Sequence, residues 1–354
     1  MSKLNVMQWH KQVTSLQIDI SSHCNARCGA CIRNNDGGET DADLPLDHFD
    51  LNLWKRIANK DTKKYWIRKL TLNGNWGDPM MHPHLIEMMQ IWYEAHPMSI
   101  PAISTNGSMR GPKFWYDLAS IMRKFPNHKV DFSIDGLEDT HSIYRRKTDF
   151  NKIIENIKSF VKADGHAVIK FTMFKHNEHQ HEQIKELAKE LGVNGLDIRE
   201  SHSKHMQIKD KDEEYEIVAS KDIPESRYVL RDDPIRSLSP STHQILTIND
   251  MYDDYMDNSD EHKTKCPWYN AGEVQIDPWG TIWPCCHVSM FGIKMKKTDM
   301  SEVDDTVPQA RIDNNLKHSS LYDILSSDWY NEHLKLKVKN AKWQICRQNC
   351  GVQA

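Results

Sequence analysis

The stretch "SSHCNARCGACIRN", residues 21–34, places three cysteines at positions 24, 28 and 31. It directly follows the alternating run "SLQIDIS" (15–21), and no further cysteine occurs in the next 234 residues. Three thiolates from one short loop suit an iron–sulfur cluster or zinc far better than an oxygen-preferring ion. The side chain of His23 would point away from that of Cys24 in an extended segment, so no fourth ligand completes the loop. Because a structural zinc site needs four ligands, the loop favours a cluster with one open iron.

Strand-like and helix-like segments alternate outward from this loop. The predicted strands span 15–21, 69–74, 100–107, 129–136, 167–175 and 195–201. The predicted helices span 47–60, 84–95, 112–125, 150–163 and 178–193, with apolar residues repeating at helical spacing. Parallel neighbours need a crossover connection, which helices supply. The pattern therefore predicts an α/β fold, a partial (β/α)6 barrel, with a flat doubly wound sheet as the alternative.

Composition narrows the class of protein further. The 354 residues carry a formal charge of −4, and no run approaches the roughly 18 apolar residues that span a bilayer. The first residues, "MSKLNVMQWHKQ", lack a basic flank followed by an apolar stretch. We expect a soluble, cytoplasmic protein with neither a membrane nor nucleic acid as its partner. Eight cysteines in such a chain are better explained as metal ligands or reactive thiols than as disulfides.

The strand–helix rhythm stops near residue 200. Residues 201–265 hold 15 acidic and 9 basic side chains, which predicts either a solvated insertion or a lid that faces the substrate. The segment "EVQIDPWGTIWP" (273–284) predicts a β-hairpin that turns at Pro278–Gly280 and brings Cys266 and Cys285 together. The expected parts are a core at 1–200, the insertion at 201–265 and a cysteine-containing extension at 266–354.

The Cys-x3-Cys-x2-Cys loop after a first strand resembles the signature of the radical S-adenosylmethionine (SAM) superfamily. The resemblance implies that Cys24, Cys28 and Cys31 hold a [4Fe–4S] cluster whose open iron binds SAM. An electron from the cluster would cleave SAM to a 5′-deoxyadenosyl radical, which abstracts hydrogen from a substrate.

Segments after the next strands match other parts of this family pattern. "NGNWGDP" resembles the family's Gly-Gly-Glu-Pro segment, and "STNG" resembles its ribose-contacting segment. The resemblance implies SAM contacts from these two segments through Gly77, Asp78, Pro79, Ser104, Thr105 and Asn106. Because Asp is one methylene shorter than Glu, we expect the main chain of the first segment to matter more than its carboxylate.

A serine and an arginine follow the fourth strand at the spacing that the family uses for the SAM carboxylate. These are Ser133 and Arg145, with Arg146 as the alternative, and a guanidinium is a natural carboxylate partner. The family commonly has an aromatic residue before the third cysteine, where this chain has Ala30. We therefore expect adenine to pack elsewhere, around Ile198 on the sixth strand.

The last five cysteines resemble the twitch extension of the SPASM/twitch subgroup. The resemblance implies an auxiliary [4Fe–4S] cluster on Cys266, Cys285, Cys346 and Cys350, with a structural zinc site as the alternative. The larger SPASM extension, with two auxiliary clusters, would need more thiols than remain. Cys286 is then either a small buried apolar residue or a weak candidate for a catalytic thiol near the substrate.

The resemblance predicts an enzyme without identifying its substrate. We expect modification of a peptide or protein side chain, with oxidation or rearrangement of an amino sugar or nucleotide as the alternative. A non-catalytic iron–sulfur or zinc protein is the alternative of another class. The expected partners are the substrate and a reducing protein such as flavodoxin or ferredoxin. We expect the insertion and the hairpin to cover the mouth of the barrel, and expect deletion of the insertion to spare cluster content.

Overall fold

The computed structural model describes residues 9–201, 203–211, 213–221, 227–229, 267–293 and 306–334. Its centre is a nine-stranded sheet in the order β11-β10-β1-β2-β3-β4-β5-β6-β9. The strands are β1 (Ser15–Ile18), β2 (Lys69–Leu72), β3 (Ile100–Thr105), β4 (Lys129–Ser133), β5 (Ala167–Met173), β6 (Gly195–Glu200), β9 (Arg227–Val229), β10 (Glu273–Ile276) and β11 (Ile282–Trp283). Each of the strands β1 to β5 pairs in parallel with the next strand, up to β6, as the sequence predicts.

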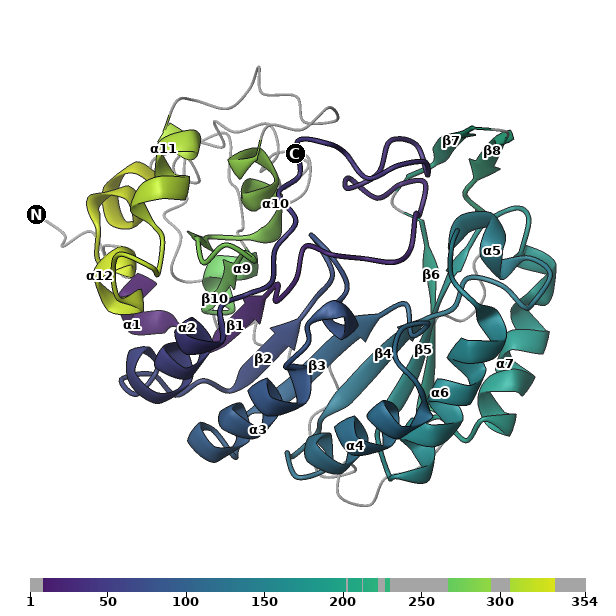
Figure 1. Ribbon diagram of the computed structural model, residues 1–354, viewed down its shortest axis with the longest axis horizontal. Helices are drawn as coiled ribbons and strands as arrows, with labels where there is room; N and C mark the ends of the chain where they lie inside the picture. The colour runs from purple at the N-terminus through teal and green to yellow at the C-terminus, as the bar shows by residue number, and fades with distance from the viewer. Residues whose placement is uncertain are drawn as a thin grey trace, which may run out of the picture.

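Helices cover one face of this sheet, which curves around the opposite face (Figure 1). They are α2 (Leu51–Arg56), α3 (Leu85–Ala95), α4 (Pro112–Met122), α6 (Phe150–Lys162) and α7 (His181–Glu190). Alternate strand residues such as Leu70, Ile103 and Phe132 pack with these helices in one apolar core. Because successive side chains of a strand point to opposite faces, one set packs on the helices and the other set faces the interior of a partial barrel.

The inner face of the sheet is polar. At mid-height it carries Gln17, Thr71, Asp131, Lys170 and Gln275, each one residue away from an apolar residue of the helix-covered core. Lys170 pairs with Asp131 on the neighbouring strand at 2.6 Å, which confirms that the two side chains share a face. An interior lined in this way suits a polar ligand or water rather than an apolar core.

The first predicted helix begins later than the sequence suggests. Residues 47–49 run beside the end of β1 instead, where the Ser22 amide donates to the Asp47 carbonyl and the Phe49 amide to the Ile20 carbonyl. The helix starts after Asp50, whose carboxylate accepts from the Leu53 amide. It continues as a π-helical turn over Ile57–Asp61.

The described part of the acidic segment is ordered. Strands β7 (His205–Asp210) and β8 (Glu213–Val218) form an antiparallel hairpin, and β9 pairs with β6. Short helices complete the fold: α1 (Trp9–Gln12), α5 (His141–Tyr144), α9 (Pro267–Asn270), α10 (Cys286–Ser289), α11 (Thr306–Asp313) and α12 (Leu321–Leu325). Within the described residues, no helix is long and apolar enough to cross a bilayer.

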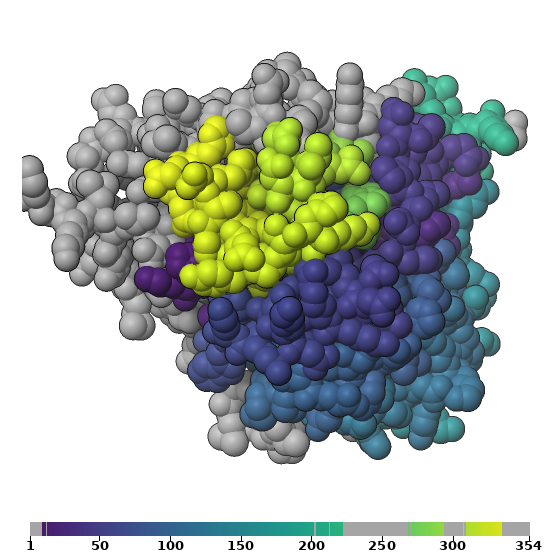
Figure 2. Space-filling view, turned by 60° about the vertical axis from the view of Figure 1, so that its left-hand side comes forward, coloured from purple at the N-terminus to yellow at the C-terminus, as the bar shows by residue number. Residues whose placement is uncertain are grey.

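The predicted C-terminal hairpin is confirmed as β10–β11, and it extends the main sheet rather than forming a separate one. Strand β10 lies parallel to β1, with Leu16 opposite Val274. Residues 306–334 lie against the first hundred residues of the chain (Figure 2). In this contact the Arg56 guanidinium donates to the carbonyls of Leu316 and Ser319.

Candidate functional site

The three cysteines of the first loop lie together at the carboxyl end of β1. Cys28 is buried, and Cys24 and Cys31 are half-buried. The Cys31 amide donates to the Cys28 carbonyl at 3.2 Å, which closes the loop into a turn. Burial raises the pKa of Cys28 to about 11 and raises the pKa of Cys24 further, and the neighbouring thiols add to both shifts. The thiols of Cys24 and Cys28 are therefore protonated at neutral pH when no metal is bound, and a metal must displace these protons to bind.

The chemistry of three cysteine ligands is compatible with an iron–sulfur cluster. Among the described residues, no three His, Cys, Asp or Glu side chains converge as ligands of one metal ion. In an iron–sulfur cube each cysteine binds its own iron, so the sulfurs need not meet around one point. Two donors already face these sulfurs, Asn106 Nδ2 at 3.8 Å from Cys24 Sγ and Arg145 Nη1 at 3.6 Å from Cys28 Sγ.

The segment after β2 packs on the cysteine loop through its backbone. The Asp78 amide donates to the His23 carbonyl at 2.8 Å. A Cβ added to Gly77 would lie 2.3 Å from the Ser21 carbonyl oxygen and 2.5 Å from that of His23. Only glycine fits so close an approach of two backbones. The predicted Gly77–Asp78 segment therefore touches the predicted cluster loop.

The Asp78 carboxylate joins this segment to the end of β3. It accepts from the Thr105 hydroxyl at 2.9 and 3.0 Å, from the Asn106 amide at 2.8 Å and from Asn106 Nδ2 at 2.7 Å. Asn106 also donates to Asn25 Oδ1, inside the cysteine loop, at 2.9 Å. Three segments predicted from separate motifs are thus one hydrogen-bonded unit. The neighbouring Ser104 donates to Asn73 at 3.3 Å.

Arg145 lies at the centre of the site. Its Nε donates to the buried Asp135 carboxylate at 2.5 Å, and its Nη1 faces Cys28. Ser133 is the last residue of β4, and Asp135 follows it by two residues. The structure thus brings Arg145 to the cysteine loop, while the sequence reasoning missed its partner Asp135.

Arg146 points elsewhere and fixes the β7–β8 hairpin to the cysteine loop. Its guanidinium donates to the Gly37 carbonyl at 3.0 Å and to the carboxylates of Asp210, at 2.5 Å, and Glu213. The buried side chain of Ile208 packs on the same loop, where a Cβ at Gly29 would meet its Cδ1 at 2.2 Å. With its guanidinium engaged in this way, Arg146 is poorly suited as a SAM ligand.

The C-terminal cysteines are described only in part. Cys285 is buried and caps α10, whereas Cys266, Cys346 and Cys350 lie outside the described residues. Burial, together with the charge of Asp19, raises the pKa of Cys286 to about 12, so this thiol is not an activated nucleophile.

Ile198 is 1% exposed within the main core. The side chain of Ile198 therefore offers little exposed surface to a ligand. Its packing against adenine remains a prediction.

Sequence reasoning missed two buried charged residues that flank the loop. Asp19 is fully buried at the carboxyl end of β1 and accepts from Gln275 at 2.7 Å and from Asn75 at 3.2 Å. Burial raises its pKa to about 7, although those hydrogen bonds oppose the shift. Arg33 is 2% exposed and lies just past Cys31. The sequence did offer a signal for both residues. Asp19 stands between two isoleucines at the end of β1, and Arg33 closely follows the cysteines of the loop.

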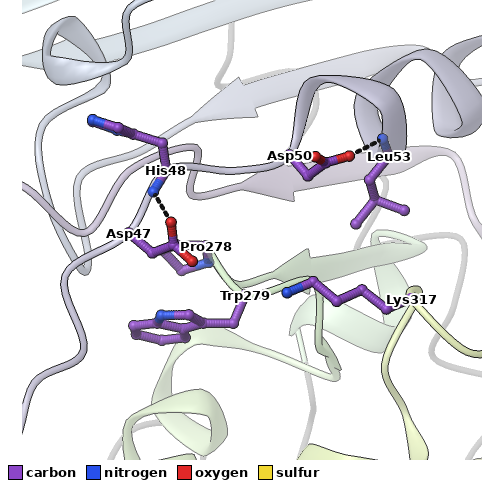
Figure 3. Close-up of a pocket in the computed structure, with 7 residues that line it drawn as sticks. All are labelled: Asp47, His48, Asp50, Leu53, Pro278, Trp279 and Lys317. Atoms are coloured by element: carbon purple, nitrogen blue, oxygen red, sulfur yellow. Dashed lines mark hydrogen bonds between the residues drawn. The ribbon is translucent and has the colours of Figure 1, made fainter.

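A surface pocket of about 370 Å³ lies where residues 47–53 meet the β10–β11 turn. Asp47, Asp50, Trp279 and Lys317 are among its lining residues (Figure 3). Asp50 caps α2 and the Asp47 carboxylate accepts from the His48 amide, so both acids already have partners. None of the predicted site residues lines this pocket, which therefore marks the junction of core and extension.

Comparison with known proteins agrees with this geometry. The radical SAM superfamily model matches residues 18–191, and the SPASM model, an iron–sulfur cluster-binding domain, matches residues 266–351. The GTP 3′,8-cyclase of Desulforamulus reducens (strain ATCC BAA-1160 / DSM 100696 / MI-1) is 22% identical over 190 residues, 52% of this chain and 54% of that protein. The chain thus spans about half the length of this curated relative.

Solved structures show the same fold. Streptococcus suis SuiB bound to S-adenosylmethionine matches with a TM-score of 0.55 and 14% identity, over 91% of this chain and 68% of SuiB. The protein anSMEcpe, bound to AdoMet and the Cp18Cys peptide, matches with a TM-score of 0.53 and 14% identity, over 95% of this chain and 88% of its own. The two matching models, the parallel sheet and the loop of three cysteines lead to one conclusion: this chain belongs to the radical SAM superfamily, whose cofactors are a [4Fe–4S] cluster and S-adenosylmethionine, and it carries a SPASM domain for auxiliary iron–sulfur clusters.

Proposed function

We propose that this enzyme binds its catalytic cluster through Cys24, Cys28 and Cys31 and modifies a peptide or protein side chain. When bound, the cluster and SAM supply one-electron cleavage of SAM and abstraction of a hydrogen atom from the substrate. The observation that carries the proposal is the hydrogen-bonded unit of three segments around these thiols. Its members follow three different strands, so a parallel sheet is needed to bring them together.

The contacts of the site suggest how SAM is held. The Asp78 carboxylate already accepts four hydrogen bonds from within the chain, so Gly77, Asp78 and Pro79 act on SAM through their main chain. Asn106 is shared with the cysteine loop. Ser104, Thr105 and Asn106 would together make the ribose contacts that the family resemblance implies.

Arg145 is the proposed partner of the SAM carboxylate, together with Ser133. Asp135 orients the guanidinium from one side, and the cysteine loop lies on the other. A guanidinium that keeps a free edge beside a cluster is well placed to bind a carboxylate. Arg146 is already occupied by the hairpin, which favours Arg145 over it.

Two observations support a peptide substrate: the similarity in fold to SuiB and the polar inner face of the sheet. SuiB also matches in a structure with its precursor peptide SuiA, with a TM-score of 0.54 over 92% of this chain. The polar inner face of the sheet suits a substrate that enters with polar groups, as a peptide backbone does. A nucleotide is the second candidate, because curated relatives over half of the chain are GTP 3′,8-cyclases.

The extension would hold one auxiliary [4Fe–4S] cluster on Cys266, Cys285, Cys346 and Cys350. Of the eight cysteines in the chain, only Cys286 then remains, too few for a second auxiliary cluster. We retain the division into a core (1–200), an insertion (201–265) and an extension (266–354). A flavodoxin or ferredoxin in the cytoplasm would supply the reducing electron.

The substrate class can be tested by mass spectrometry under anaerobic conditions. The reconstituted enzyme is incubated with SAM, dithionite and either GTP or a set of candidate peptides. A peptide that changes mass only when SAM is present supports the proposal. Conversion of GTP, with every peptide unchanged, would favour the nucleotide alternative.

A further inference from the structure

Arg33 is among the largest fully buried side chains of the molecule. It follows the third cysteine by two residues and reaches back beneath the loop. Its Nε donates to the Trp76 carbonyl at 2.5 Å, and its Nη2 donates to the Ser22 carbonyl at 2.7 Å. Both acceptors are neutral backbone groups.

Within the part of the chain that the structure describes, the remaining nitrogen of this guanidinium has no hydrogen-bond partner. Arg33 Nη1 is buried and makes no hydrogen bond. Within the described residues, no carboxylate lies within ion-pair distance of Arg33. The closest comparison is Arg27 in the same loop, which is partly exposed and bonds to Glu39 through two nitrogens at 2.9 and 2.7 Å. Among the described residues, Arg33 is therefore a buried cation without a counter-charge, an arrangement that destabilises a protein unless an anion is supplied.

The three thiols are the neighbouring groups that become anionic. Arg33 lies two residues after Cys31, and its Nη2 donates to the carbonyl of Ser22, two residues before Cys24, so the guanidinium joins the two ends of the cysteine loop. Asp78 is not the partner of Arg33, because its carboxylate accepts from Thr105 and Asn106 instead. A cluster on three thiolates carries net negative charge, and reduction adds more.

We propose that Arg33 is the buried counter-charge of the catalytic cluster, and that it raises the reduction potential of this cluster. This inference rests on the proposed cluster site at Cys24, Cys28 and Cys31. A fixed positive charge stabilises the reduced, more negative state more than the oxidised state. Arg33 is thus a positioning residue that sets the driving force for electron transfer, with no contact to the substrate required.

The test is an EPR-monitored redox titration of the reconstituted enzyme without SAM. Wild type is compared with Arg33→Gln, Arg33→Lys and the control Arg27→Gln, which removes an exposed and already paired charge from the same loop. Iron content is measured first, so that failure to form the cluster is recognised separately. We expect a more negative potential in Arg33→Gln, a potential near that of wild type in Arg33→Lys, and no change in Arg27→Gln.

A shift of equal size in Arg33→Gln and Arg27→Gln would overturn the proposal, as would an unchanged potential in a fully loaded Arg33→Gln. If that variant keeps its potential but binds SAM more weakly, the anion facing Arg33 is the SAM carboxylate, which also contradicts the proposal. If wild type itself forms no cluster when the three cysteines are intact, the proposed function fails instead.

A second measurement covers a variant that loads poorly. Thermal unfolding of the apo and the reconstituted protein gives the stabilisation that the cluster provides. Because an unpaired buried cation destabilises the apo form, Arg33→Gln should gain less from reconstitution than wild type or Arg33→Lys does. An equal gain in all three proteins would contradict the proposal.

Discussion

Replacing Gly77 by alanine tests whether the close backbone approach holds the site together. The added Cβ would lie 2.3 Å from the Ser21 carbonyl oxygen, where an ordinary carbon–oxygen contact needs about 3.3 Å. The two backbones must then separate by about 1 Å, which breaks the 2.8 Å hydrogen bond from Asp78 to His23. Overpacking costs about 1–3 kcal/mol and the lost bond about 1 kcal/mol, so we expect a loss of about 2–4 kcal/mol.

Urea denaturation of the apo protein measures this loss, and iron content after reconstitution measures its effect on the cluster loop. We expect Gly77→Ala to lower both the unfolding midpoint and the iron bound. Gly111→Ala is the matched control, because a Cβ there meets nothing within 4 Å. A Gly77→Ala protein with the stability and iron content of the control would refute the reasoning.

Three further changes test other parts of the site. Arg145→Ala should weaken SAM binding by about 1.5–3 kcal/mol, measured by calorimetry, and unchanged affinity would exclude the proposed carboxylate contact. Ile208→Ala, which leaves a cavity beside the cysteine loop, should lower cluster iron, whereas the more exposed Val218→Ala on the same hairpin should not; equal iron in both would show that the hairpin is no support. The raised pKa of Asp19, about 7, lies above its unfolded value of about 3.9. The stability from this group is complete below pH about 4 and is lost as the pH rises through about 7. In Asp19→Asn the unfolding midpoint should therefore fall less between pH about 4 and about 7 than in wild type. The same dependence on pH in both proteins would contradict the raised pKa of Asp19.

The local elements were largely predictable because each strand and helix carries its own period. The six parallel strands and the hairpin turning at Pro278–Gly280 follow from alternation and turn residues. The pairing of β10 with β1 could not be predicted, because residues 15–18 and 273–276 meet only through the tertiary fold. The sequence of neither strand specifies which edge of the sheet it joins.

The hairpin β7–β8 was hidden by the charge of its segment. Met206, Ile208 and Ile217 alternate with charged and polar residues and bury one face in a small apolar cluster with Phe174, but the excess of acidic residues favoured a solvated insertion. Its contacts with the cysteine loop also change one expectation. Deletion of the whole 201–265 segment would remove Ile208 from Gly29, so we now expect it to reduce cluster content rather than spare it.

Site residues on a short motif were easier to find than their partners. The Cys24–Cys31 spacing is visible in the sequence, and the resemblance supplied Arg145. The carboxylate that orients this arginine, Asp135, lies ten residues earlier, just after β4, and no sequence motif links the two. Arg33 belongs to no recognisable motif, because its significance lies in being buried with no counter-charge among the described residues.

The most direct test of the central claim is the formation of 5′-deoxyadenosine by the anaerobically reconstituted protein with SAM and dithionite. Wild type should carry about eight irons, four for each of two clusters, and should release 5′-deoxyadenosine. The variant with Cys24, Cys28 and Cys31 all replaced by alanine should keep about half of the iron and release none. Release of 5′-deoxyadenosine by this variant, or none from a fully loaded wild type, would contradict the assignment of the catalytic cluster.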